Sequence, residues 1–142
     1  MRVARFILAI AATISVGGGA LRGQESKKVT VTGNVVDAAC FMIHPSAATT
    51  PSHKECGDAC VARGVPLAIV NEADGQIYFA ADGAKRIGSF HHQRVTATGM
   101  SVRKNEPMEL KMAVGDTNEM AVKVTGGYNV ITIDSLSAAP KK

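Results

Sequence analysis

The sequence predicts a mainly β protein, a small OB-like β-barrel with one short helix inserted after the first strand. Two observations support this fold class. Short segments in which apolar and polar residues alternate recur along the chain, separated by Gly-, Pro-, Asn- and Asp-containing turns. Their order contains the strand, hairpin, short helix and strand of an OB barrel, with an extra hairpin before the last strand. A small β-sandwich is the alternative architecture.

The first 23 residues are predicted to be a secretory signal peptide. Arg2 and Arg5 precede the apolar run 6–16, and small residues follow it. The run is shorter than the ~20 residues that a membrane-spanning helix needs. We therefore expect residues 24–142 to form a single periplasmic or secreted domain with no membrane span after cleavage. An N-terminal anchor that is not cleaved is the alternative.

The basic charge of the full chain lies largely in this leader. Cleavage after Gly23 removes Arg2, Arg5 and Arg22 from the 16 Lys and Arg residues, which leaves 13 against 12 Asp and Glu. The chain has two Tyr, four Phe and no Trp, and no basic stripe interleaved with aromatic residues. Both observations argue against nucleic acid as a partner.

The expected strands follow a regular order. In the first, 27–37, Val29, Val31 and Val35 share one face, and Gly33 indicates a bulge or a close backbone approach. Met residues that alternate within the later strands are expected to pack in the core rather than to bind copper. The remaining predictions are a loop at 38–51, a hairpin of 67–71 and 76–80, a short helix at 84–90, and strands at 94–104, 108–114, 120–125 and 128–136. The topology of the hairpin over 108–125 stays open.

A helix over residues 53–63 is the expected insertion. Ser52 is a good N-cap, and Glu55 three residues later completes a capping box. Gly64 suits the left-handed position after the helix, and Pro66 prevents its continuation. Within this helix His53, Cys56 and Cys60 fall in an arc of about 60° on one face.

These three side chains and Cys40 form a candidate metal site. A Cys3His set suits tetrahedral Zn²⁺, and thiolates also suit Cu(I), so zinc or copper is the expected cofactor. Asp37, three residues before Cys40, is expected to orient His53. His44 is an alternative ligand to His53.

The adjacent His91 and His92 are expected to point in different directions, as neighbours on a strand or helix do. A ligand role is therefore not expected for them.

Two other interpretations of the cysteines remain open. Thiols tend to form disulfides in an oxidising compartment. Three cysteines cannot all pair within one chain, so one would be left over. A disulfide from Cys40 to Cys56 or Cys60 would staple an OB-like ligand- or partner-binding module and leave one free thiol. Alternatively, Cys56 lies near a helix N-terminus beside His53, which favours a reactive thiolate. A CxxC redox motif is absent, so we expect binding or structure rather than catalysis, with a metal ion and another envelope protein as candidate partners.

The first half of the mature chain also resembles a group of small exported bacterial proteins with an OB-like body. They share G-x-V-x-D-x2-C, then H-x2-C-x3-C, then G-x-P and a hairpin. The resemblance implies a shared cysteine and histidine cluster but names no reaction. The matching positions here are Gly33, Val35, Asp37, Cys40, His53, Cys56, Cys60, Gly64 and Pro66.

Overall fold

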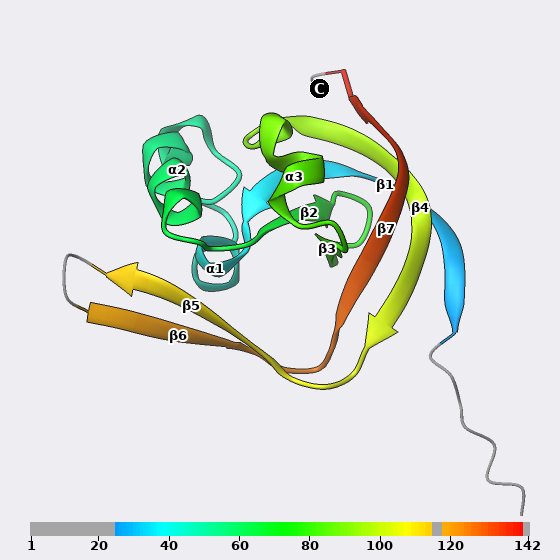
Figure 1. The fold of residues 1–142 in the computed structure, drawn as a ribbon. Coiled ribbons are helices and arrows are strands. Elements are labelled where there is room, and N and C mark those ends of the chain that lie inside the picture. Colours follow the sequence, from blue (N-terminus) through cyan, green and yellow to red (C-terminus); the bar gives the residue numbers. More distant parts are fainter. Residues whose placement is uncertain (1–24, 115–117, 141–142) are drawn as a thin grey trace, which may run out of the picture.

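The computed structural model describes residues 25–114 and 118–140, and it is mainly β. Five strands close into a barrel in the order β1-β2-β3-β7-β4, with β3 and β7 parallel and all other neighbours antiparallel (Figure 1). This confirms the OB-like barrel. The predicted leader 1–23 and part of the predicted turn at 115–119 lie outside the described residues. The barrel strands are β1 (Ser26–Asp37), β2 (Leu67–Asn71), β3 (Ile77–Ala80), β4 (Arg94–Lys104) and β7 (Tyr128–Ala138).

The first strand closes the barrel by pairing with two neighbours in succession. Its first nine residues pair with β4, and its last five pair with β2, so that Gly33 faces both Val95 and Asn71. A Cβ at Gly33 would lie 1.7 Å from the carbonyl oxygen of Val70, and only glycine permits this approach. The close backbone contact expected at Gly33 is confirmed.

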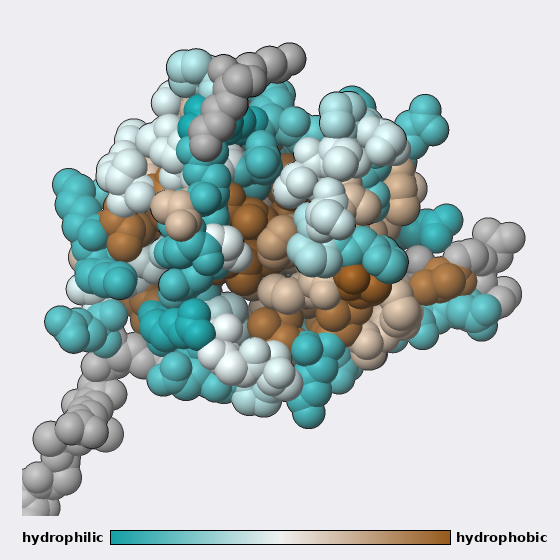
Figure 2. All heavy atoms as spheres, turned by 180° about the vertical axis from the view of Figure 1, so that it is seen from behind, coloured by the Kyte–Doolittle hydropathy of each residue, from teal (hydrophilic) through white to brown (hydrophobic). Residues whose placement is uncertain are grey.

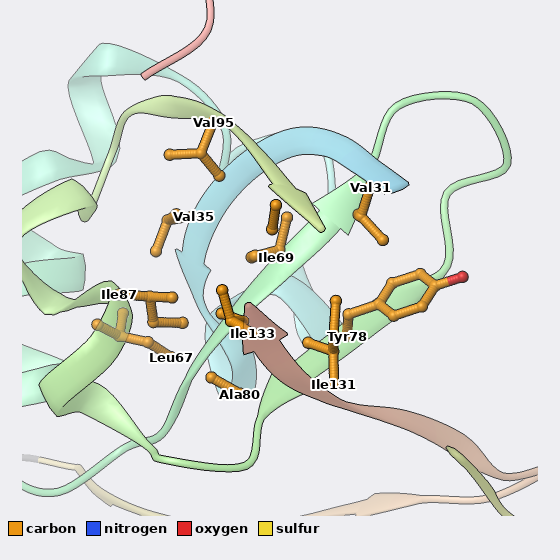
Figure 3. Close-up of a cluster of buried hydrophobic side chains, with 11 residues drawn as sticks. Val31, Val35, Leu67, Ile69, Tyr78, Ala80, Ile87, Val95, Ile131 and Ile133 are labelled. Atoms are coloured by element: carbon orange, nitrogen blue, oxygen red, sulfur yellow. The ribbon is translucent and has the colours of Figure 1, made fainter. Parts of the chain in front are cut away.

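Aliphatic side chains fill the barrel, as the low aromatic content predicts. Val31 and Val35 of β1 point inward with Ile69 and Ile131, and each is at most 1% exposed (Figure 3). The short helix α3 (Ala84–Ile87), continued by the turn η2 (Gly88–Phe90), closes one end with the buried side chain of Ile87. This matches the short helix predicted at 84–90.

Two helices, not one, are inserted between β1 and β2. The predicted loop at 38–51 contains α1 (Ala38–Ile43), because Asp37 caps it with its side chain. The second helix, α2 (Lys54–Ala62), follows the turn η1 (Pro51–His53), so the predicted capping box is wrong. Ser52 Oγ instead lies 2.9 Å from Thr50 Oγ. The predicted end of the helix is confirmed, since Gly64 has φ +93° and the N–H of Val65 bonds to the carbonyl of Cys60.

The additional hairpin forms a separate two-stranded sheet of β5 (Met108–Val114) and β6 (Asn118–Val124). It lies beside α1 (Figure 1), where Leu110 and Val124 join a second buried cluster that includes Cys40 and Cys60. Met108 and Met112 pack against this cluster, as expected.

The outer part of the hairpin carries hydrophobic side chains into solvent. Met120 is 37% exposed and Val114 43%, so the core position expected for Met120 is wrong. Seen from behind, hydrophobic side chains gather on the lower right of the molecule (Figure 2). Within the described residues, no helix is both long and apolar enough to cross a membrane.

Candidate metal centre

Asp37, the last residue of β1, links the two inserted helices. Its Oδ1 accepts a hydrogen bond from the backbone N–H of Cys40 at 2.9 Å, which caps α1. Its Oδ2 lies 3.2 Å from Nε2 of His53, where the Asp37 side chain is fully buried and that of His53 is 11% exposed. The expected contact between Asp37 and His53 is therefore present, and one carboxylate fixes both segments.

The three cysteines converge from the two helices. Cys40 lies in α1, whereas Cys56 and Cys60 lie one turn apart on α2. The Sγ atoms of Cys40 and Cys60 are 3.4 Å apart, and all three Sγ atoms lie within 4.8 Å of one another. Cys40 and Cys60 are buried and Cys56 is exposed. The cluster thus has two donors inside the protein and one at its surface.

The histidine joins this cluster through Cys40. Donor atoms of Asp37, Cys40 and His53 form a second group within 4.8 Å of one another, so Cys40 is common to both groups. His44, the alternative ligand, lies exposed at the end of α1 and belongs to neither group. The structure thus favours His53 over His44 as the histidine of the site.

Burial keeps the inner thiols protonated in the absence of a cation. It raises the pKa of Cys40 far above the ordinary thiol value, and interaction with the carboxylate of Asp37 raises it further. Burial also raises the pKa of Cys60, to which the negative charge of Asp37 contributes. A bound metal ion would reverse this preference, because it compensates the thiolate charge and takes the place of the protons.

A third group of donors was missed by the sequence reasoning. Asp58 of α2 meets both His91 and His92, whose ring centroids are 3.5 Å apart. The expectation that adjacent histidines point in different directions is wrong here. His92 has φ +62°, which turns the chain out of strand geometry and brings the two rings to the same side. Of the contacts of Asp58, the sequence indicates only the ion pair with Lys54, because the two residues are four apart on a helix. The positive φ of His92 has no signal in the sequence.

The aromatic residues of the middle strands do not form an exposed binding face. Tyr78 is 7% exposed and Phe79 is 8% exposed. Tyr78 contributes to the barrel core, and Phe79 packs edge-on against Tyr128. A barrel-face binding module would have to use other residues.

No protein-family model, curated protein or solved structure matches the chain. The resemblance to small exported bacterial proteins stays a prediction.

Proposed function

We propose that this protein is an exported metal-binding protein, periplasmic or secreted, that holds one zinc or copper ion with Cys40, Cys56, Cys60 and His53. The observation that carries the proposal is the convergence of three thiols beside the buried Asp37–His53 pair. The role is binding or structural rather than catalytic.

The spacing of the sulfur atoms fits such an ion. Four ligands at Zn–S distances of about 2.3 Å in a tetrahedron place neighbouring sulfur atoms about 3.8 Å apart. The Cys40 and Cys60 sulfur atoms, 3.4 Å apart, are close to this value, and no two sulfur atoms of the group are more than 4.8 Å apart. The three sulfur atoms form one group, and His53 reaches it through Cys40, so its ring would have to move to join all three thiolates.

The surroundings also suit a metal ligand set. Asp37 holds the Nε2 side of His53, as carboxylates commonly do for ligating histidines. Nδ1 of His53, or Nε2 after the ring turns, would then complete the coordination of the ion. Cys56 is the exposed donor, so another envelope protein would reach the ion from this side.

Cobalt titration of the reduced protein tests the proposal, because Co²⁺ reports sulfur ligation through thiolate charge-transfer absorption. We expect one equivalent to produce this band and zinc to displace it. Cys40→Ser and Cys56→Ser should each weaken the band, and His53→Gln should weaken affinity while His44→Gln should not. A folded protein that gives no charge-transfer band would refute the proposal.

A disulfide-stapled module is the second candidate, and one observation favours it. The Sγ atoms of Cys40 and Cys60 are 3.4 Å apart, and these residues lie on α1 and α2. Loss of two electrons and two protons to an external oxidant would form one bond between them and leave Cys56 as the free thiol. Mass spectrometry of the exported protein, non-reduced, distinguishes this state by the loss of two hydrogen atoms.

A further inference from the structure

The group Asp58, His91 and His92 has the geometry of a ligand set of its own. Nδ1 of His91 lies 2.9 Å from Oδ1 of Asp58, and Nε2 of His92 lies 3.2 Å from the same oxygen. Ligands at about 2.0–2.2 Å from one ion, at angles near those of a tetrahedron or octahedron, are about 2.8–3.6 Å apart. All three donor atoms lie within 4.8 Å of one another. The set is therefore close to the arrangement that an ion requires.

The chemistry of the three groups suits a cation. Burial lowers the pKa of His91, as does the neighbouring His92, which favours the neutral imidazole that binds metals. Lys54 donates a hydrogen bond to Oδ2 of Asp58 at 2.6 Å. Lys54 would compete with a cation for the carboxylate, but it bonds to Oδ2. The oxygen that faces both histidines is Oδ1.

The two ring nitrogens of His91 differ in their surroundings. Nδ1 faces Asp58, whereas Nε2, on the other edge of the ring, is buried and has no hydrogen-bond partner among the described residues. The donor toward an ion at Asp58 is therefore Nδ1. In addition, both histidines and Lys54 line a cavity of about 340 Å³, which gives a small ion and its water ligands access to the rings.

We propose that Asp58, His91 and His92 form a second, sulfur-free site for a divalent transition ion of the Zn²⁺ class. Two imidazoles and one carboxylate suit Zn²⁺, Cu²⁺, Ni²⁺ or Fe²⁺ rather than the soft Cu⁺ that thiolates favour. The remaining coordination positions belong to water or to a ligand in the cavity. This site shares no donor with the cysteine centre.

A variant without thiols isolates this second site. We would titrate Zn²⁺ into the purified triple variant Cys40→Ser, Cys56→Ser, Cys60→Ser by calorimetry, and follow the histidine Cε1–H signals by NMR. We expect one equivalent to bind and to shift the signals of His91 and His92. His91→Gln or His92→Gln in this background should weaken binding at least tenfold, since loss of even an outer partner of a ligand costs about 10–100-fold.

His44→Gln and Asp134→Asn are matched controls, because both residues are exposed and lie outside the three donor groups. They should leave zinc affinity unchanged. If the folded triple variant binds no zinc, or binds it equally well without His91 and His92, the second site is refuted whatever the cysteines do.

If the triple variant does not fold, the intact reduced protein decides. Its zinc content at saturation should fall by one ion per chain on His91→Gln, with the cobalt–thiolate band unchanged. A constant zinc content would overturn the proposal and leave the cysteine centre untouched.

Discussion

Replacing Asp37 by alanine should destabilise the protein by about 2–4 kcal/mol in the metal-free state. The change removes the side-chain cap of α1, and caps of this kind contribute about 1 kcal/mol. It also leaves His53, 11% exposed, without its carboxylate partner, and an unpaired buried polar group costs about 1–3 kcal/mol. Since domains of this size are stable by about 5–15 kcal/mol, the loss is readily measured.

Asparagine at this position separates the two contributions. Asp37→Asn keeps an oxygen that accepts from the N–H of Cys40, so the cap survives. It loses the negative charge that faces His53, so we expect about 1–2 kcal/mol of destabilisation. His53→Gln and the double variant complete a cycle that measures the coupling of the pair directly.

Urea unfolding followed by circular dichroism, with a chelator present, measures these free energies. An alanine variant within about 0.5 kcal/mol of the parent, the range of ordinary surface changes, would show that the Asp37 contacts do not hold the site together. In the presence of zinc, Asp37→Asn should lower affinity about 10–100-fold at unchanged stoichiometry.

Three further predictions follow from the geometry. Gly57→Ala should lower the melting temperature, because the new Cβ would lie 2.8 Å from Cε1 of His92. This clash should outweigh the higher helix propensity of alanine, which is worth about 1 kcal/mol. Gly88→Ala is the control: its Cβ would meet nothing within 4 Å, so the melting temperature should not fall. Zinc affinity should rise at least about 100-fold per pH unit between about pH 6 and 8, since the two buried thiols each release a proton when they bind the ion. A flat profile in a competition titration would contradict this. Burial lowers the pKa of His91, so its contribution to stability is present above the ordinary value of 6.5 and is lost on acidification below it. In chelator, His91→Gln should therefore lose less stability than the parent between about pH 7 and 5, and equal losses would refute the assignment.

Patterns that depend on local chemistry were readable from the sequence. Alternation placed the barrel strands, and Gly33 and Gly64 occupy backbone positions that only glycine, or glycine most readily, permits. The cysteines of α2 lie on one face because the spacing of four residues matches a helical turn. Asp37 was expected beside His53, and the structure places it there.

What the sequence could not show depends on contacts between distant segments. The helix α1 is short, and its cap comes from a strand residue whose carboxylate is shared with His53. The pairing of Asp58 with His91 spans 33 residues, and the positive φ of His92 brings the second ring to the same side; no periodicity signals either feature. Both features arise where the inserted helices pack against the barrel, so tertiary structure decides them.

Metal content measured together with the thiol count tests the central claim most directly. The protein would be exported to a bacterial periplasm and purified without chelator or added metal, in parallel with Cys56→Ser. We predict that the parent carries one zinc or copper ion per chain more than the variant, and that its three thiols react only after denaturation with chelator. Equal metal in both proteins, with a single reactive thiol per parent chain, would contradict the metal centre and identify a disulfide between Cys40 and α2 instead.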